Sequence, residues 1–110
     1  MVLTRLFSET VRERAQREPA FREALLMEGV DALLAGDLEG GKIGLRVFIN
    51  ATIGFEALAA ATGTPAKSLM RMFSAAGNPS VSNLCGVLCE LQRQSGISLR
   101  ARLIEETATS

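Results

Sequence analysis

The sequence contains no histidine, tryptophan or tyrosine among its 110 residues, and it has only five phenylalanines. Histidine is the side chain that proteins use most often as a general base and as a metal ligand near neutral pH. Aromatic side chains supply the stacking surface with which proteins bind single-stranded nucleic acids. These absences disfavour most catalytic and metal-binding functions, and they disfavour a single-strand-binding surface.

The sequence also lacks a cysteine framework, because its only two cysteines are Cys85 and Cys89. They lie four positions apart in "NLCGVLCEL", so a helix would place both on one face with Leu84, Leu88 and Leu91. Neighbouring helical turns hold a cysteine pair in poor disulfide geometry, and a zinc site would need two further ligands. We therefore expect buried, reduced thiols, with no metal and no cofactor.

Long apolar runs are missing too, since none approaches the roughly 20 residues of a membrane span. The opening "MVLTRLFSETVRER" becomes charged too early for a secretory signal. We therefore expect a cytoplasmic protein with no membrane partner. The chain contains no phosphate-cradling loop and no paired carboxylates outside ordinary helix surfaces, so we expect that it is not an enzyme.

Net charge is zero, but the charges are unevenly distributed along the chain. Residues 1–41 carry five basic and eight acidic side chains, whereas residues 42–104 carry seven basic and only two acidic ones. Such asymmetry between two halves of a chain is a pointer to a polyanionic partner on the basic part. A solvated charged surface is the alternative explanation of the same distribution.

The first third of the chain predicts a pair of helices. Apolar residues recur at helical spacing from Leu3 to Ala15, Pro19 suits the first turn of a second helix, and Gly36 is a natural stop. We therefore predict an N-terminal helical pair, residues 1–36, followed by a second unit, residues 37–110. Asp37 is a candidate cap for a third helix, which glycines weaken until about Lys42.

The second unit predicts three more helices and one strand. "FEALAAAT" ends at Gly63, Thr64 is a candidate cap for "PAKSLMRMF" with Pro65 at its first position, and Ser80 or Ser82 begins a helix that ends before Gly96. The segment "ISLRARL", residues 97–103, alternates apolar and polar residues as a half-buried strand does. The predicted fold class is all-α, a compact domain of five to six helices with a short C-terminal β-strand.

Residues 54–74, "GFEALAAATGTPAKSLMRMFS", have the pattern of a helix-turn-helix, in which two helices cross steeply over a short turn. Ala59 would allow close approach at the crossing, Gly63 tolerates the turn, and Leu69 would face inward. Leu58, Met72 and Phe73 complete the predicted inner face. A helical hairpin with no role in DNA binding remains an alternative for this spacing.

The segment "FEALAAATGTPAKSLMRMFSAAGNPSVSNLCGVLCELQRQSGISL" resembles the phage λ repressor/Cro-like (XRE-type) helix-turn-helix domain. More narrowly, residues 37–103 resemble the addiction-module antidote proteins, which are the antitoxins of toxin–antitoxin pairs. Those proteins couple a Gly-Asn-Pro loop to a short apolar C-terminal strand. One departure is Phe55, which stands where many λ-type domains have a glutamine that contacts phosphate.

The resemblance implies that the helix beginning at Pro65 enters the DNA major groove. Lys67 and Arg71 would reach guanine or phosphate, while Ala66 and Met70 would contact a thymine methyl group. A solvated helix face for the two cations, and a core position for Met70, remain alternatives. The DNA-binding residues expected from the resemblance are Thr52, Thr64, Ala66, Lys67, Ser68, Met70, Arg71, Ser74, Gly77 and Asn78.

The resemblance further implies a homodimeric transcriptional regulator of a palindromic operator, acting as the antitoxin and autorepressor of its operon. The predicted strand would pair with its copy in a second subunit through Ile97, Leu99, Ala101 and Leu103, with the N-terminal helices as the alternative dimer contact. The acidic N-terminal helical pair would suit a small basic toxin. The rival hypothesis is a protein-interaction module of the same fold that has lost DNA binding.

Overall fold

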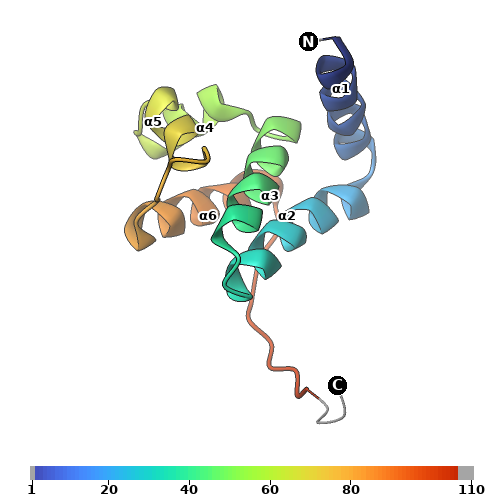
Figure 1. The fold of residues 1–110 in the computed structure, drawn as a ribbon. Coiled ribbons are helices and arrows are strands. Elements are labelled where there is room, and N and C mark those ends of the chain that lie inside the picture. Colours follow the sequence, from blue (N-terminus) through green and yellow to red (C-terminus); the bar gives the residue numbers. More distant parts are fainter. Residues whose placement is uncertain (1, 107–110) are drawn as a thin grey trace.

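The computed structural model describes residues 2–106, and this part of the chain folds into helices joined by short turns (Figure 1). The helices α2 to α6 surround a common core, while α1 projects to one side of it (Figure 1). The all-helical class is therefore confirmed. The six helices are α1 (Val2–Arg17), α2 (Pro19–Leu34), α3 (Leu38–Ala51), α4 (Phe55–Thr62), α5 (Ala66–Met72) and α6 (Val81–Ser95).

The boundaries of α2 and α3 lie at the helix start, stop and capping residues of the sequence. Helix α2 begins at Pro19, and the chain leaves it through Gly36, whose φ of 85° is a left-handed conformation that favours glycine. The Asp37 side chain caps α3 by accepting a hydrogen bond of 2.9 Å from the Gly40 amide. Helix α3 therefore starts at Leu38, ahead of the predicted firm start at Lys42.

Glycines inside α2 and α3 allow these two helices to pack in close contact. A Cβ atom added to Gly44 would lie 2.8 Å from the Cα of Gly29, and one added to Gly41 would overlap the Leu33 side chain. The low helix propensity of glycine is thus offset by close packing, which no larger residue permits here. This role explains why a glycine-rich segment that looked like a weak helix is a regular one.

The pair α4 and α5 has the expected short connection. Gly54 and Gly63 flank α4 with φ values of 82° and 75°, and the axes of α3 and α4 differ by 98°. The prediction that Thr64 caps α5 is wrong, because Pro65 holds the cap position and makes no side-chain capping bond. The hydroxyl of Thr62 accepts a hydrogen bond from the Thr64 amide instead, so the turn is held from the end of α4.

The core confirms the predicted inner face of the helix pair. Leu58, Leu69, Met72 and Phe73 are all buried in one cluster, which α3 supplies with Phe48 among others. Leu26 of α2 lies in the same cluster, so the predicted N-terminal unit, residues 1–36, shares its core with the unit of residues 37–110. Residue 1 and residues 107–110 of these two units lie outside the described residues.

The predicted strand at residues 97–103 is absent, and no residue between 2 and 106 is in a strand. Gly96 ends α6 with a φ of 73°, and residues 97–106 continue without regular structure. Ile97 and Leu99 pack half-buried against the core of their own chain, and the Leu99 amide donates to Oε1 of Gln92 at 2.8 Å. The first half of the alternating pattern thus packs on the core of its own chain, whereas Ala101 and Leu103 are exposed.

The prediction of buried cysteines is also wrong, because Cys85 and Cys89 are exposed free thiols. The buried side of α6 carries Val87 and Leu91, and the cysteines lie past the edge of that side. The buried side of α6 is therefore narrower than the predicted five-residue apolar stripe.

Across residues 2–106, no single helix is long and apolar enough to span a membrane. Helices α3 and α4 taken together meet the same criteria of length and composition, but they are joined at a sharp bend.

Candidate nucleic-acid interface

A shallow surface depression of about 770 Å³ lies between α5, the following loop and the start of α6. It brings together six of the ten residues predicted to contact DNA. These six are Lys67, Ser68, Arg71, Ser74, Gly77 and Asn78. Residues from one helix and from the loop after it therefore form one continuous surface.

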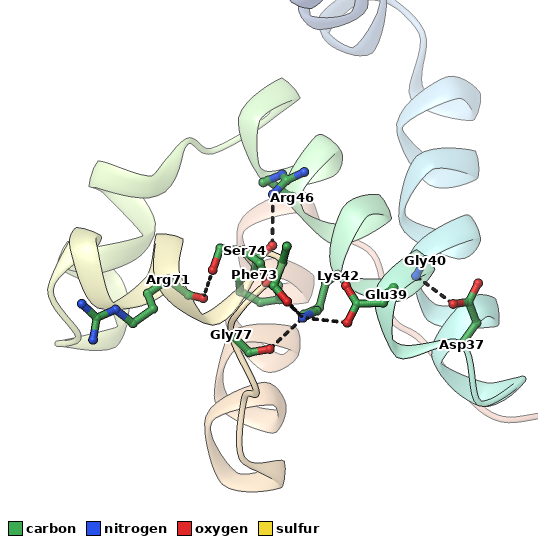
Figure 2. A network of polar contacts seen from close by, with 10 residues as sticks. Asp37, Glu39, Gly40, Lys42, Arg46, Arg71, Phe73, Ser74 and Gly77 are labelled. Atoms are coloured by element: carbon green, nitrogen blue, oxygen red, sulfur yellow. Dashed lines mark hydrogen bonds and ion pairs between the residues drawn. The ribbon is translucent and has the colours of Figure 1, made fainter.

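The charge of this depression is entirely positive. Among the residues that the structure describes, Lys67 and Arg71 are its only charged lining residues, and no acidic side chain lines it. Both side chains are exposed, and neither forms an ion pair within residues 2–106. Figure 2 shows the Arg71 guanidinium pointing away from the network of polar contacts behind it. The two cations are thus available to an external anion.

Helix α5 divides cleanly into a buried side and an open side. Leu69 is 1% exposed and belongs to the core, whereas Met70, one position later, is 46% exposed. Met70 is therefore on the outer side and is not a core residue. Ala66 and Thr64 are half-buried at the start of the helix, outside the lining of the depression.

The loop after α5 is held by a lysine that the sequence did not mark. Lys42 of α3 is only 2% exposed, and its Nζ donates to the carbonyl oxygens of Ser74, Ala75 and Gly77 at 3.0, 3.3 and 2.7 Å (Figure 2). The Glu39 carboxylate lies 3.2 Å from the same nitrogen. A buried ammonium with these partners has all its donors satisfied. Lys42 therefore fastens the loop to α3.

A second cation of α3 holds the end of α5 itself. Nη1 of Arg46 donates to the Phe73 carbonyl oxygen at 3.2 Å (Figure 2). The last carbonyl groups of a helix lack intrahelical partners, and cationic side chains are suited to bind them. Because α5 has only seven residues, its orientation depends on such outside contacts. Helix α3 thus fixes the position of α5 and its loop.

Gly77 has a steric role in the loop that only glycine can fill. A Cβ atom there would overlap the carbonyl oxygens of Arg71 and Met72. Its own amide donates to the Ser74 carbonyl oxygen at 3.0 Å, so this amide is already used inside the loop. The Asn78 amide has no backbone acceptor in the part of the chain that the structure describes, which leaves Asn78 as the amide suited to bind phosphate.

Thr52 lies on a different part of the surface from the predicted residues beside α5. It follows α3, and its hydroxyl donates to the Phe48 carbonyl oxygen at 2.6 Å. It lines a different hollow, together with Gln94 and Ser95 at the end of α6. The structure therefore does not bring Thr52 to the depression beside α5.

Four further lining residues are not among the predicted DNA contacts. These four are Met72 at the end of α5, Ala76 and Pro79 in the loop, and Asn83 in the first turn of α6. The capping bond from the Asn83 amide to the Ser80 hydroxyl, 3.0 Å long, fixes where α6 starts and so places Asn83. Lys42 could be found only from its burial, since a lysine between Gly41 and Ile43 looks like an ordinary surface residue.

In comparisons with protein-family models, with curated proteins and with solved structures, nothing matches this chain. The geometry of the depression and the charges on it therefore carry the functional argument.

Proposed function

We propose that this protein is a sequence-specific, double-stranded DNA-binding transcriptional regulator that inserts α5 into the major groove. The observation that carries this proposal is the pair Lys67 and Arg71, both exposed, unpaired within the described chain and set in a depression free of acidic groups. A positive surface on a protein of zero net charge suits a polyanion. The short α4–α5 connection supports the helix-turn-helix form of that surface.

Each group on this surface has a function in the proposed complex. Lys67 and Arg71 lie four positions apart and therefore project from the same side of α5. An arginine that meets a guanine edge forms two hydrogen bonds, whereas a lysine provides a point charge for guanine or phosphate. The exposed Met70 would contact a thymine methyl group, and the Asn78 amide would bind a phosphate that sets the register.

Two cations per chain support only weak binding, so the proposal includes a homodimer. The slope of log affinity against log salt is about −0.9 for each phosphate neutralised, which gives only about −1.8 for one chain. Two chains related by a two-fold axis double the contacts and match a palindromic operator with half-sites about 34 Å apart. Ala101 and Leu103 of the predicted dimer contact are exposed, whereas Ile97 and Leu99 are packed on their own chain.

The proposed biological role is that of an antitoxin that represses its own operon, with a small basic toxin as partner. The excess of acidic residues in the N-terminal third supports this partner surface. One observation also favours the alternative, a protein-interaction module that has lost DNA binding. Leu6 and Phe7 of α1 are 54% and 69% exposed, and exposed apolar residues of this size suit a protein contact.

A gel-shift experiment with the DNA upstream of the protein's own coding sequence, at two salt concentrations, separates the two functions. The regulator should shift a fragment that contains a palindrome at low salt and release it at higher salt, while a scrambled fragment of equal length is bound more weakly. Equal binding to both fragments would remove sequence specificity from the proposal. No shift at the lower salt concentration would favour the protein-interaction module.

A further inference from the structure

Helix α1 leaves its apolar side largely uncovered. Of its apolar residues with described side chains, Ala15 is fully buried and Val11 half-buried, whereas Leu6 and Phe7 are mostly exposed. An apolar side of this kind costs free energy in water unless another surface covers it. Some occupant of this side is therefore expected.

The uncovered side opens onto a groove along the outer side of α3. Two hollows of about 400 and 300 Å³ adjoin there, and Val47 lines both of them. Phe7 and Val11 of α1 line the first hollow, and Leu25 of α2 lines the second with Ile43. Ile43 and Val47 are 52% and 37% exposed, so the floor of this α3 groove is apolar and open to solvent.

The two ends of the α3 groove differ in charge. Glu28 and Asp37 line the end nearest the start of α3, where no basic side chain from the described part of the chain lines the hollow. Arg12 lines the other end together with Glu9. A ligand that fits this pattern carries positive charge first and apolar side chains next, while the far end, with one charge of each sign, accepts an acidic side chain beside Arg12.

The C-terminal tail of the chain has this order of side chains. Residues 100–106 read "RARLIEE", in which two arginines precede an apolar pair and two glutamates follow it. Every residue from 100 to 106 is exposed, and the side chains of Leu103 and Ile104 are 95% and 79% exposed. The tail is thus a second uncovered apolar element of the same molecule.

The lengths of the two elements also agree. The helical rise from Gly40 to Ala51, which bound the lining along α3, is about 16 Å at 1.5 Å per residue. An extended chain covers about 16 Å between Arg100 and Glu105, at roughly 3.3 Å per residue. When Arg100 lies beside Glu28 and Asp37, the acidic end of the tail therefore reaches the end that holds Arg12.

We propose that the α3 groove of one copy holds the tail, residues 100–106, of a second copy. Successive side chains of an extended chain point to opposite sides, so Arg100, Arg102 and Ile104 face the groove together. Ile104 covers Ile43 and Val47, and the two arginines face the acidic end. In Figure 1 the tail leaves the body of its own chain and runs away from α1, which disfavours its own groove as the site. Exchange of two tails across a two-fold axis covers both grooves at once. The inference rests on the proposed homodimer but does not depend on DNA binding.

Sedimentation equilibrium of full-length variants tests the apolar contact. Ile104→Asp should raise the dimer dissociation constant by at least about 100-fold, because each dimer loses a buried apolar side chain twice. Val81→Asp is the matched control, since Val81 is also 79% exposed but lies on α6 outside the groove. A wild-type monomer at all concentrations, or equal dissociation constants for Ile104→Asp and wild type, would overturn the inference.

A charge-reversal pair tests the direction in which the tail lies. The variant Arg100→Glu with Arg102→Glu should dimerise more weakly than wild type, and adding Glu28→Arg should restore part of the affinity. Glu28 is suited to this exchange because it is exposed and forms no ion pair in the described chain. A further weakening by Glu28→Arg would contradict the proposed orientation.

A disulfide experiment separates a second copy from the same chain. Cys85 and Cys89, both exposed, are replaced by serine, and then Ile104→Cys and Val47→Cys are placed on different chains and mixed. The inference predicts a cross-linked pair of chains on oxidation. Failure to cross-link in this mixture, with a bond forming only within a chain that carries both cysteines, would show that the tail occupies its own groove. A cross-linked protein that does not bind DNA would retain the inference and overturn the proposed regulator.

Discussion

The depression beside α5 and the α3 groove are both shallow, but their side chains differ in kind. Within residues 2–106, the charged residues that line the depression are both cationic, and Lys42 holds its loop in place through three hydrogen bonds. The α3 groove is apolar along its floor, with acidic residues at one end. A preorganised positive surface suits a polyanion, whereas an open apolar groove suits a peptide segment. Helix α3 contributes to both surfaces, with Lys42 on one side and Val47 on the other.

The largest expected difference between buried and open parts of the molecule comes from two phenylalanines. Phe73→Ala should lower the free energy of unfolding by about 3–5 kcal/mol, because Phe73 is 1% exposed and fills the core behind α5. Phe7→Ala should change it by no more than about 0.5 kcal/mol, because Phe7 is mostly exposed on α1. Urea denaturation at a concentration that keeps the chain monomeric measures both. An equal loss of unfolding free energy for both variants would mean that the Phe7 side chain is buried and not exposed on α1.

The next effect concerns the buried lysine. Lys42→Met should lower the free energy of unfolding by about 2–3 kcal/mol, because three carbonyl oxygens of the loop lose a charged donor. Lys67→Met serves as the control and should change stability by no more than about 0.5 kcal/mol, since Lys67 is exposed. Thermal or urea denaturation gives both values. An unchanged free energy of unfolding for Lys42→Met would show that water replaces the ammonium at these oxygens.

A smaller effect distinguishes two glycines. Gly77→Ala should lower the free energy of unfolding by about 1–3 kcal/mol, because the added methyl group overlaps the Arg71 and Met72 carbonyl oxygens. Gly86→Ala should instead raise it by about 0.5–1 kcal/mol, because Gly86 lies inside α6 with open space around it. The two substitutions add the same atom, so opposite signs in urea denaturation test the loop geometry. A stabilising Gly77→Ala would refute that geometry.

Local features of the fold could be predicted because they depend on a few adjacent residues. Pro19, Gly36, Gly63 and Gly96 mark helix boundaries in the structure, and Asp37 caps α3 as expected. Each of these positions is decided by backbone conformation or by a hydrogen bond within four residues. The helices and the inner face of α4 and α5 were therefore accessible from the sequence.

Features that depend on distant contacts could not be predicted. The predicted strand at residues 97–103 is irregular because Ile97 and Leu99 find their cover on their own core. The role of Gly44 emerges only beside Gly29, a residue of another helix. Lys42 binds a loop more than 30 positions away, and no local sequence pattern predicts such a contact.

The salt dependence of DNA affinity tests the central proposal most directly. With upstream DNA that contains the palindrome, a wild-type dimer should give a log–log slope between about −1.8, when the two Lys67 side chains alone neutralise phosphates, and about −3.6, when the two Arg71 side chains do so as well. The double variant Lys67→Ala with Arg71→Ala should lose roughly that amount of slope, and Arg71→Ala alone should weaken specific binding by about 1–3 kcal/mol. Arg17→Ala, which removes the same charge from exposed α1, should leave both values unchanged. Fluorescence anisotropy over a salt series provides the measurement, and identical slopes for wild type and the double variant would contradict DNA binding through α5.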